Sequence, residues 1–400
     1  MFIPYTKPTI DLGIIRNSIS GNKVTAIEKA VSKILTKKFA LFTADCRTAL
    51  YLAFSVIEPK GEVITTPMAC EAAITPIIAA GHKPKFIDID KSTGNFNVKL
   101  LAKNINESTI GILVVHLGGI PAPIEQIIHI AREKNLIIVE DCAHAFGSSD
   151  VNKIPLGTMG DISCLNFCKG LFGMGGMFLT SNQPMFEKAV AIHNTFPLRS
   201  KKIIPFRLIR NFLQRSIRSQ ASFDRYYKFM SFAEKLSQRS DSNEDNYYEI
   251  PYENLVRPLT SEANYTWYML NKHWQKNKTG RQRIFDYYKN NITRKTTFEI
   301  LGNPLKNSLL TRLYIKAPDQ SNELIKQLFT EHNIECKHLS QDYRSPYQKF
   351  LGDIQYFRKN AIWTNCSLTK ELNDELLSVP FYPSISYQEI DYVIKAIKSI

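Results

Sequence analysis

Two stretches of this chain decide its fold: IIVEDCAHAFGSS at residues 137–149 and GDISCLNFCKGLFGMGGMFLT at residues 160–180. In the first stretch, Asp141 stands at the end of a hydrophobic run that is typical of a buried strand. In the second stretch, Lys169 follows another apolar run and opens a glycine-rich segment. Glycines let the backbone approach a ligand closely. The two stretches therefore predict a ligand site where neighbouring strands end.

An acid and a lysine placed in this way are the two groups that pyridoxal phosphate chemistry requires. The amine of Lys169 can form a Schiff base with an aldehyde, and the carboxylate of Asp141 can keep a pyridine nitrogen protonated. Two plainer interpretations exist: Lys169 as a surface lysine, and Asp141 as a helix N-cap. We favour the cofactor interpretation for both, because a carboxylate at the end of a buried strand needs a cationic partner.

Other polar residues are weaker candidates for cofactor contacts. His144 is placed to touch the cofactor ring or its phenolic oxygen, but a satisfied, partly buried histidine is an equal alternative. Cys46 and Arg47 lie where a predicted strand turns into a helix, and a helix N-terminus attracts phosphate. Any such turn shares this property, so the signal is weak. Asn166 is a second phosphate candidate, with a core-facing amide as the alternative.

The first half of the chain alternates predicted strands with predicted helices. The strands are Phe39–Thr43, Glu62–Pro67, Pro84–Asp90, Ile110–His116, Leu136–Asp141, Asp161–Phe167 and Gly176–Ser181. The helices are Thr48–Val56, Glu71–Ala80, Val98–Asn104 and Ile124–Lys134. Strict alternation indicates an α/β fold with a mainly parallel sheet. Such sheets bind ligands at the carboxyl ends of their strands.

The second half predicts a different organisation. We expect four parts: a large α/β domain at 1–195, a basic insertion at 196–250, a helical connection at 251–290 that completes the large domain, and a small C-terminal α+β domain at 291–400. Helical periodicity covers Ser261–Tyr288. In the last part we expect strands at Leu310–Lys316 and Leu377–Val379 and a helix at Gln388–Ile400.

The insertion begins with a basic amphipathic segment, 199–218. Read as a helix, it places Phe206, Ile209, Leu213 and Ile217 on one face, between arginines. A basic amphipathic helix can lie on an anionic membrane, which suggests peripheral membrane contact through 200–220. Packing on the protein itself or across a subunit interface is the more usual role of such a helix, and we favour it.

Composition narrows the class of protein. The chain has 400 residues, 44% of them hydrophobic, which is an ordinary globular balance. The seven cysteines are scattered without metal-ligand spacing, so we expect reduced thiols and no metal site. No signal peptide or membrane span is recognisable, so we expect a cytoplasmic protein. The net charge of +14 suits an anionic partner, and without a nucleic-acid motif an anionic small substrate or a membrane is favoured over nucleic acid.

Taken together, these residues resemble the DegT/DnrJ/EryC1/StrS family of sugar aminotransferases, over roughly the whole chain except 196–250. The shared motifs are Thr48-Ala-Leu50, Pro84–Asp90, Val115-His116 with Gly119 and Pro121, Glu140–Ala145, Gly160-Asp161, Lys169 with Gly175-Gly176, and Val379–Pro383. Each motif is unspecific alone, whereas their order is specific. The resemblance implies a divergent member with the fold type I architecture of aspartate aminotransferase.

The resemblance also implies residue roles. Lys169 looks like the lysine that holds the cofactor covalently, Asp141 like the partner of the pyridine nitrogen, and His144 like the residue near the cofactor oxygen. Cys46 and Arg47 fall on a phosphate turn that is usually Gly-Thr, and Asn166 falls on a position that is usually Ser.

Two further departures concern what surrounds the cofactor. Cys70 stands where many members carry an aromatic ring. The family's Gly-x-Asn-x-Arg loop is not recognisable, although Arg257 and Asn264 lie in the corresponding region.

The resemblance implies that the protein transfers an amino group from an amino acid to a keto-sugar. Glutamate is the expected donor, and the expected keto-sugar is nucleotide-linked and therefore anionic. Relatives that dehydrate sugars carry histidine in place of the lysine, so Lys169 favours transamination. We expect a homodimer that acts in surface glycan synthesis, such as lipopolysaccharide or capsule. The alternatives are another pyridoxal phosphate reaction on a sugar, such as deoxygenation, or a non-catalytic scaffold or sensor.

Overall fold

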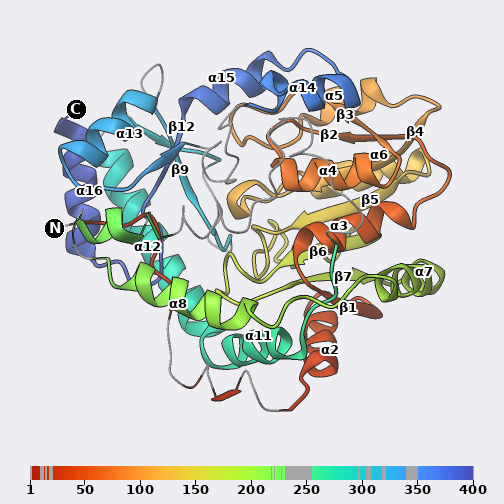
Figure 1. Ribbon diagram of the computed structural model, residues 1–400. Helices are drawn as coiled ribbons and strands as arrows, with labels where there is room; N and C mark the ends of the chain where they lie inside the picture. Colours follow the sequence, from red (N-terminus) through yellow and green to blue (C-terminus); the bar gives the residue numbers. More distant parts are fainter. Residues whose placement is uncertain are drawn as a thin grey trace.

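The computed structural model of the chain describes residues 2–9, 13, 16–17, 21–217, 219, 221–226, 228–229, 255–295, 298–302, 308–317, 321–338 and 350–399. Within them, one eight-stranded sheet has the order β1-β7-β6-β5-β4-β2-β3-β11 (Figure 1). The strands are Phe39–Thr43 (β1), Glu62–Thr65 (β2), Lys83–Phe86 (β3), Thr109–Val115 (β4), Ile137–Cys142 (β5), Ile162–Asn166 (β6), Gly176–Thr180 (β7) and Ile362–Trp363 (β11).

The sheet is mainly parallel, as the alternation predicts. Only the two pairs that involve β7 are antiparallel. The predicted strands are present within a few residues of their expected ends. β3 is shorter than predicted, because Asp88 turns away from the sheet: its carboxylate accepts the backbone N–H of Thr369 at 2.8 Å and that of Leu368 at 2.9 Å.

Helices cover both faces of this sheet, because successive strand residues point to opposite sides. Val63 and Val139 pack with α3 and α4, whereas Ile64 and Ile138 pack with α5 and α6. The helices of this large unit are Val24–Ile34 (α2), Cys46–Ser55 (α3), Glu71–Ala79 (α4), Val98–Asn104 (α5), Ile124–Glu133 (α6), Gln183–Asn194 (α7) and Thr260–Lys272 (α11), with a 3₁₀ turn at Leu117–Gly119 (η1). α2 and α7 are additions to the predicted elements.

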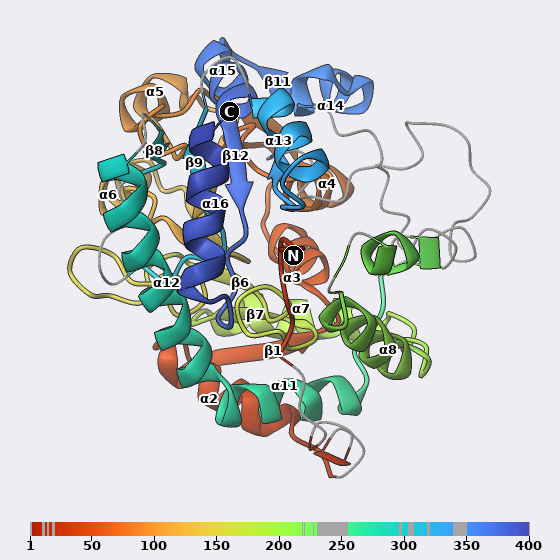
Figure 2. The same ribbon diagram turned by 90° about the vertical axis from the view of Figure 1, so that its left-hand side faces the viewer.

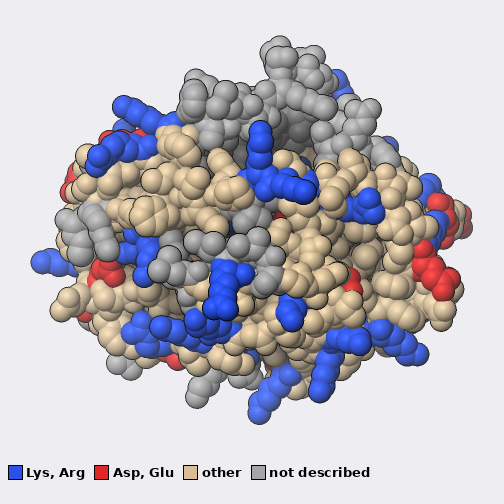
Figure 3. Space-filling model, turned by 60° about the horizontal axis from the view of Figure 1, so that its bottom comes forward, with Lys and Arg blue, Asp and Glu red and all other residues tan. Residues whose placement is uncertain are grey.

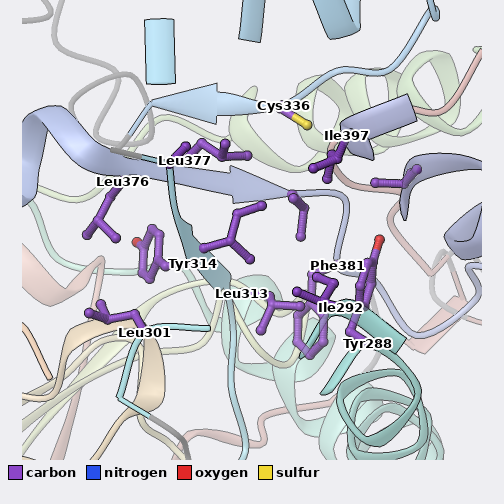
Figure 4. Close-up of a cluster of buried hydrophobic side chains, with 14 of the residues drawn as sticks. Tyr288, Ile292, Leu301, Leu313, Tyr314, Cys336, Leu376, Leu377, Phe381 and Ile397 are labelled. Atoms are coloured by element: carbon purple, nitrogen blue, oxygen red, sulfur yellow. The ribbon is translucent and has the colours of Figure 1, made fainter. Parts of the chain in front are cut away.

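A second, smaller sheet lies in the C-terminal part, as expected. Its order is β10-β12-β9-β8, antiparallel throughout, with Glu299–Ile300 (β8), Leu313–Lys316 (β9), Lys337–His338 (β10) and Leu376–Val379 (β12). Its helices are Trp274–Lys295 (α12), Ser321–Thr330 (α13) and Tyr387–Ser399 (α16). The chain between β10 and β12 also forms Leu351–Asp353 (η4) and Gln355–Asn360 (α14), which pack in the core of the large unit, and Ser367–Glu375 (α15). Figure 4 shows the core of this unit, where apolar side chains from β9, β12, α12 and α16 meet.

The N-terminal segment joins the two units. Ile3 bridges Ile334 in the small unit, and the carbonyls of Thr6 and Pro8 accept hydrogen bonds from Gln214 and Arg215 of α8. Figure 2 shows the N-terminus between the small unit and α8. Because β11 belongs to the C-terminal part but pairs with β3, the large sheet also draws on the end of the chain. The four-part domain division stays a prediction.

Two sequence interpretations need refinement. The helical periodicity over Ser261–Tyr288 is divided between two helices, α11 and α12, and the break at His273 lets Trp274 stack on Phe146 at 5.1 Å between ring centroids. The basic segment does form a helix, α8 (Ile203–Arg215), but only part of its predicted packing face is buried: Ile217, just past the helix, is buried and Leu213 is half-buried.

On α8, Phe206 and Ile209 are exposed, as is Phe212, whereas Asn211 is buried. The helix is fixed inward by polar contacts, such as that from Arg207 to the carbonyl of Gly173 at 3.2 Å. The helical spacing of apolar residues alone does not determine which side of a helix packs against the rest of the protein. Residues 230–254, which include the acidic end of the insertion, lie outside the described residues.

Candidate active site

The predicted site residues meet at one edge of the large sheet. The carboxyl ends of β4, β5 and β6 lie side by side, with Val115 opposite Asp141 and Asp141 opposite Cys164. Asn166 at the end of β6 lies opposite Gly176, which in turn lies opposite Thr43 at the end of β1. α3 therefore begins beside the strand ends that carry Asp141 and Asn166.

A cavity of about 270 Å³ opens at this edge. It is lined by all six predicted site residues, Cys46, Arg47, Asp141, His144, Asn166 and Lys169, together with Asp45, Leu50, Cys70, Ala72, Ala73, Val115, His116, Leu117, Gly118 and Ala143. The rings in this lining are the imidazoles of His116 and His144. Cys70, at the position that is often aromatic in the family, lines the cavity too, and burial raises the pKa of its thiol to about 12.

Asp141 is a buried carboxylate, only 6% exposed. Its Oδ1 accepts the backbone N–H of Ala143 at 2.8 Å, and the Cys46 thiol lies 3.9 Å from the same oxygen. Burial raises the pKa of Asp141, although the Ala143 N–H and the charge of Lys169 act in the opposite direction. A carboxyl group in this state is stabilised as an anion by a cation brought against it.

Lys169 and His144 form the centre of the cavity. The amine of Lys169 donates to Nε2 of His144 at 2.5 Å. Burial lowers the pKa of His144 well below its ordinary value, and the positive charges of Lys169 and Arg312 add to this effect. The imidazole is therefore neutral at physiological pH and accepts a hydrogen bond at Nε2.

The glycine-rich segment after Lys169 is a tight loop held to the sheet. The backbone N–H of Gly173 donates to the carbonyl of Phe167 at 2.8 Å, and the N–H of Phe167 donates to Gly175 at 3.1 Å. Gly175 has φ of +81°, which favours glycine. A Cβ at Gly176 would lie 2.5 Å from the backbone of Asp45, so glycine lets the lysine loop touch the start of α3.

The start of α3 presents the predicted phosphate turn. Asp45 caps the helix, and its Oδ1 accepts the backbone N–H of Thr48 at 2.9 Å. Cys46 is buried, and burial beside Asp141 raises the pKa of its thiol well above the ordinary value, so it is a neutral donor. Arg47 is exposed at the cavity mouth. Asn166 uses its Oδ1 to accept the Cys168 N–H at 2.7 Å, which leaves its amide nitrogen to face a ligand.

A buried pair at the cavity wall, His116, which lines the cavity, and Glu140 behind it, is not among the predicted site residues. Nδ1 of His116 accepts the Ala122 N–H at 3.1 Å, and its Nε2 donates to Glu140 at 3.2 Å. Glu140 also accepts the N–H groups of Gly157, at 2.9 Å, and Gly160. Burial alone would raise the pKa of Glu140, but the hydrogen bonds lower it.

Cys142 lies close enough to His116 and Glu140 that their ligand atoms fall within 4.8 Å of one another. The carboxylate oxygens of Glu140 already accept hydrogen bonds, and the bond from His116 links the end of β4 to β5. The absence of a metal stays a prediction.

Arg199 is another residue that the sequence analysis did not assign to the site, because it lies in the basic segment. Its guanidinium donates to Asp45 at 2.7 Å and to Glu262 at 2.9 Å. Arg257 and Asn264, which lie in the region of the missing family loop, contact this same chain. Arg257 donates to the carbonyl of Phe196 at 2.9 Å, and Asn264 accepts the N–H of Lys23 at 2.9 Å. No sequence motif identifies Arg199 as a site residue, because its partners Asp45 and Glu262 lie far away in the sequence.

Comparison with known proteins agrees with this geometry. Residues 14–202 match the model of the DegT/DnrJ/EryC1/StrS aminotransferase family, a range that contains all six predicted site residues. GDP-perosamine synthase of Escherichia coli O157:H7 is 32% identical over 178 residues, 43% of this chain and 49% of that protein. The spore coat polysaccharide biosynthesis protein SpsC of Bacillus subtilis is 25% identical over the whole chain and 97% of its own length.

The matches above 30% identity are partial, since the chain spans about half the length of the curated relatives it matches at that level. In three dimensions the whole chain superposes on 99% of Helicobacter pylori PseC, an aminotransferase of pseudaminic acid biosynthesis, with a TM-score of 0.75 and 16% identity. This likeness confirms the fold type I architecture that the sequence predicts.

Proposed function

We propose that the chain is a pyridoxal phosphate-dependent aminotransferase of the DegT/DnrJ/EryC1/StrS family, whose model matches residues 14–202. One observation carries the proposal: a lysine, a buried carboxylate and a helix N-terminus line a single cavity. These groups answer to the three reactive parts of the cofactor, its aldehyde, its ring nitrogen and its phosphate.

The residues present fit the cofactor chemically. Asp141 is a buried carboxyl group whose pKa is raised by burial, so a protonated pyridine nitrogen is the kind of partner it lacks. The free N–H groups at the start of α3, with Arg47 beside them, suit a phosphate. When bound, pyridoxal phosphate supplies an aldehyde that joins to an amine and a ring that takes up electrons.

The chain itself supplies positioning and proton transfer. Lys169 would hold the cofactor covalently, and its amine would serve as the general base for the proton on Cα of the amino acid. Neutral His144 accepts a hydrogen bond from Nζ of Lys169 and so orients that amine toward the cavity. Asp141 is fixed by the Ala143 N–H, which keeps its carboxylate pointed into the site.

We propose glutamate as the amino donor and a nucleotide-linked keto-sugar as the acceptor. The partial relative GDP-perosamine synthase supports a nucleotide-sugar substrate, and the net charge of +14 suits an anion. The full-length relative SpsC is described as a polysaccharide biosynthesis protein, which supports a role in a surface glycan, lipopolysaccharide or capsule among them.

The proposed assembly is a cytoplasmic homodimer with its active sites at the subunit interface. Light scattering would test whether the protein is a dimer.

Among the described residues, no helix combines the length and apolar character needed to span a membrane. Peripheral membrane contact through 200–220 stays a secondary proposal, favoured by the exposed Phe206, Ile209 and Phe212 beside basic side chains. Figure 3 shows more Lys and Arg than Asp and Glu on the face that is turned forward. Retention of the protein on anionic vesicles, and loss of retention in Phe212→Asp, would support it.

The test of the function is a visible absorbance spectrum of wild type and Lys169→Ala with pyridoxal phosphate, before and after glutamate. We expect wild type to develop a yellow band that glutamate bleaches, and the variant to form no covalent band. A cofactor band that no amino acid bleaches would favour another pyridoxal phosphate reaction. Absence of any cofactor binding would favour a scaffold or sensor.

A further inference from the structure

The helix end proposed to hold the cofactor phosphate carries a negative charge of its own. Asp45 lines the same cavity as Cys46 and Arg47, and its carboxylate already occupies the Thr48 N–H of the first turn of α3. A carboxylate at this place repels a phosphate dianion and competes with it for the positive end of the helix. The phosphate end of the cavity therefore needs a counter-charge.

Arg199 supplies that counter-charge from a distant part of the chain. Its Nη2 donates to Oδ2 of Asp45 at 2.7 Å, while its Nη1 donates to the Ala44 carbonyl at 2.8 Å and to Glu262 at 2.9 Å. Burial opposes the charged form of Asp45, but Arg199 and the Thr48 N–H hold the pKa of this carboxyl below its ordinary value. Asp45 is thus an anion in the cavity lining whose charge is offset by Arg199, a residue outside that lining.

The other end of this bridge is rigid. Glu262 is fully buried in the first turn of α11 and accepts the Leu259 N–H at 2.8 Å. Thr266 of the same helix accepts the Met174 N–H at 2.7 Å, next to the glycines of the lysine loop. α11 therefore holds both the start of α3, through Arg199, and the loop that follows Lys169.

We propose that Arg199 is a positioning residue of the phosphate end of the site, which neutralises Asp45 and fixes the first turn of α3 so that this helix end accepts a dianionic phosphate. The inference rests on the proposed function, since the ligand is the cofactor's phosphate. It gives the beginning of the basic insertion a role at the site.

The experiment separates charge from mere structural support. The full-length protein without cofactor is titrated with pyridoxal phosphate, followed by absorbance, in wild type, Arg199→Ala, Asp45→Asn and the double variant Asp45→Asn/Arg199→Ala. Asparagine still caps a helix, so Asp45→Asn removes the charge and keeps the cap. Arg132→Ala is the matched control, because Arg132 makes an ion pair of similar length, 2.8 Å, with Asp161 on the surface.

We expect Arg199→Ala to bind pyridoxal phosphate about tenfold more weakly or worse, because it leaves an uncompensated charge beside the phosphate. Asp45→Asn should bind at least as tightly as wild type, and the double variant should return to within about threefold of wild type. Arg132→Ala should match wild type. Inorganic phosphate should compete with the cofactor in wild type more strongly than in Arg199→Ala.

Three outcomes would overturn the inference: unchanged affinity in Arg199→Ala, a double variant as weak as Arg199→Ala, or an Asp45→Asn variant that binds more weakly than wild type. If Arg199→Ala does not fold, Asp45→Asn alone still decides. Failure of wild type to bind pyridoxal phosphate would instead overturn the proposed function, so the two failures are distinguishable.

Discussion

The cavity edge of the large sheet and the core of the small unit bury their side chains equally well, but with opposite chemistry. In the small unit, Leu313, Leu376 and Leu377 are fully buried among other apolar groups (Figure 4). At the cavity, Asp141 and His144 are almost as buried, and burial shifts both pKa values against the charged form.

This difference teaches what each region is for. Burial of apolar side chains stabilises the folded chain without cofactor, whereas burial of a carboxyl group without a cationic partner lowers its stability. A fold retains such a carboxyl group where a ligand supplies the missing charge. Changes at the cavity should therefore lower activity with little loss of stability, and changes in the small core should do the reverse.

The largest effect should come from Lys169. Lys169→Ala removes the amine that holds the cofactor and moves the proton, so we expect the rate of glutamate conversion to fall by at least about 10⁴-fold. The melting temperature without cofactor should stay close to that of wild type, because the side chain is only partly buried. Single-turnover absorbance and thermal unfolding measure the two quantities. A variant that keeps a tenth of the wild-type rate would contradict the expected role of Lys169 and the contrast between the two regions.

Asp141 should give the next largest effect. Asp141→Asn keeps an acceptor for the Ala143 N–H but loses the charge that faces the cofactor ring, so we expect the rate to fall by roughly 10³-fold. Stopped-flow absorbance with glutamate measures this rate. A rate within tenfold of wild type would show that another group protonates the ring.

In the small core, the opposite pattern is expected. Leu313→Ala leaves a cavity among fully buried side chains and should lower the free energy of unfolding by roughly 3 kcal/mol. Pyridoxal phosphate affinity of the folded fraction should remain unchanged. Urea unfolding and a cofactor titration at low temperature test both points. A weaker affinity without a loss of stability would mean that the two regions are coupled.

The smallest effect tests a buried titratable group away from the cavity. Burial and Arg257 lower the pKa of His193 to about 4. As the pH falls below the ordinary value of 6.5, the unfolded chain takes up a proton that the folded chain refuses, so stability is lost.

Between pH 7 and 5.5 this loss should be roughly 1 kcal/mol from His193. In His193→Leu the free energy of unfolding should depend less steeply on pH over this window, with cofactor affinity unchanged at pH 7. Chemical unfolding at several pH values measures the slope. An identical slope in the variant would assign the acid sensitivity to other groups.

Local patterns in the sequence predict much of the fold and of the site. The strand ends that carry Asp141 and Asn166 follow from apolar runs, and the parallel sheet brings them to one edge. The glycine-rich segment after Lys169 indicates a ligand site at this lysine. These signals are short-range, so they can be read without knowing the rest of the structure.

The remaining features depend on contacts between distant segments. Arg199 bridges Asp45 and Glu262, which lie 154 and 63 positions away, and neither separation leaves a pattern. The inward side of α8 is set by contacts to the lysine loop and to the N-terminal segment, so apolar spacing predicts the helix but only part of the face that is buried. The two-residue strand β11 is too short to give a periodic signal.

One measurement tests the central claim most directly: thermal unfolding of wild type and Asp141→Asn, each with and without saturating pyridoxal phosphate. If Asp141 is buried for the sake of a cationic ligand, the variant should be at least as stable as wild type without the cofactor. With the cofactor, the order should reverse, because only wild type gains the charge pair. A variant that is less stable than wild type without cofactor, and that gains as much from the cofactor as wild type does, would contradict the account.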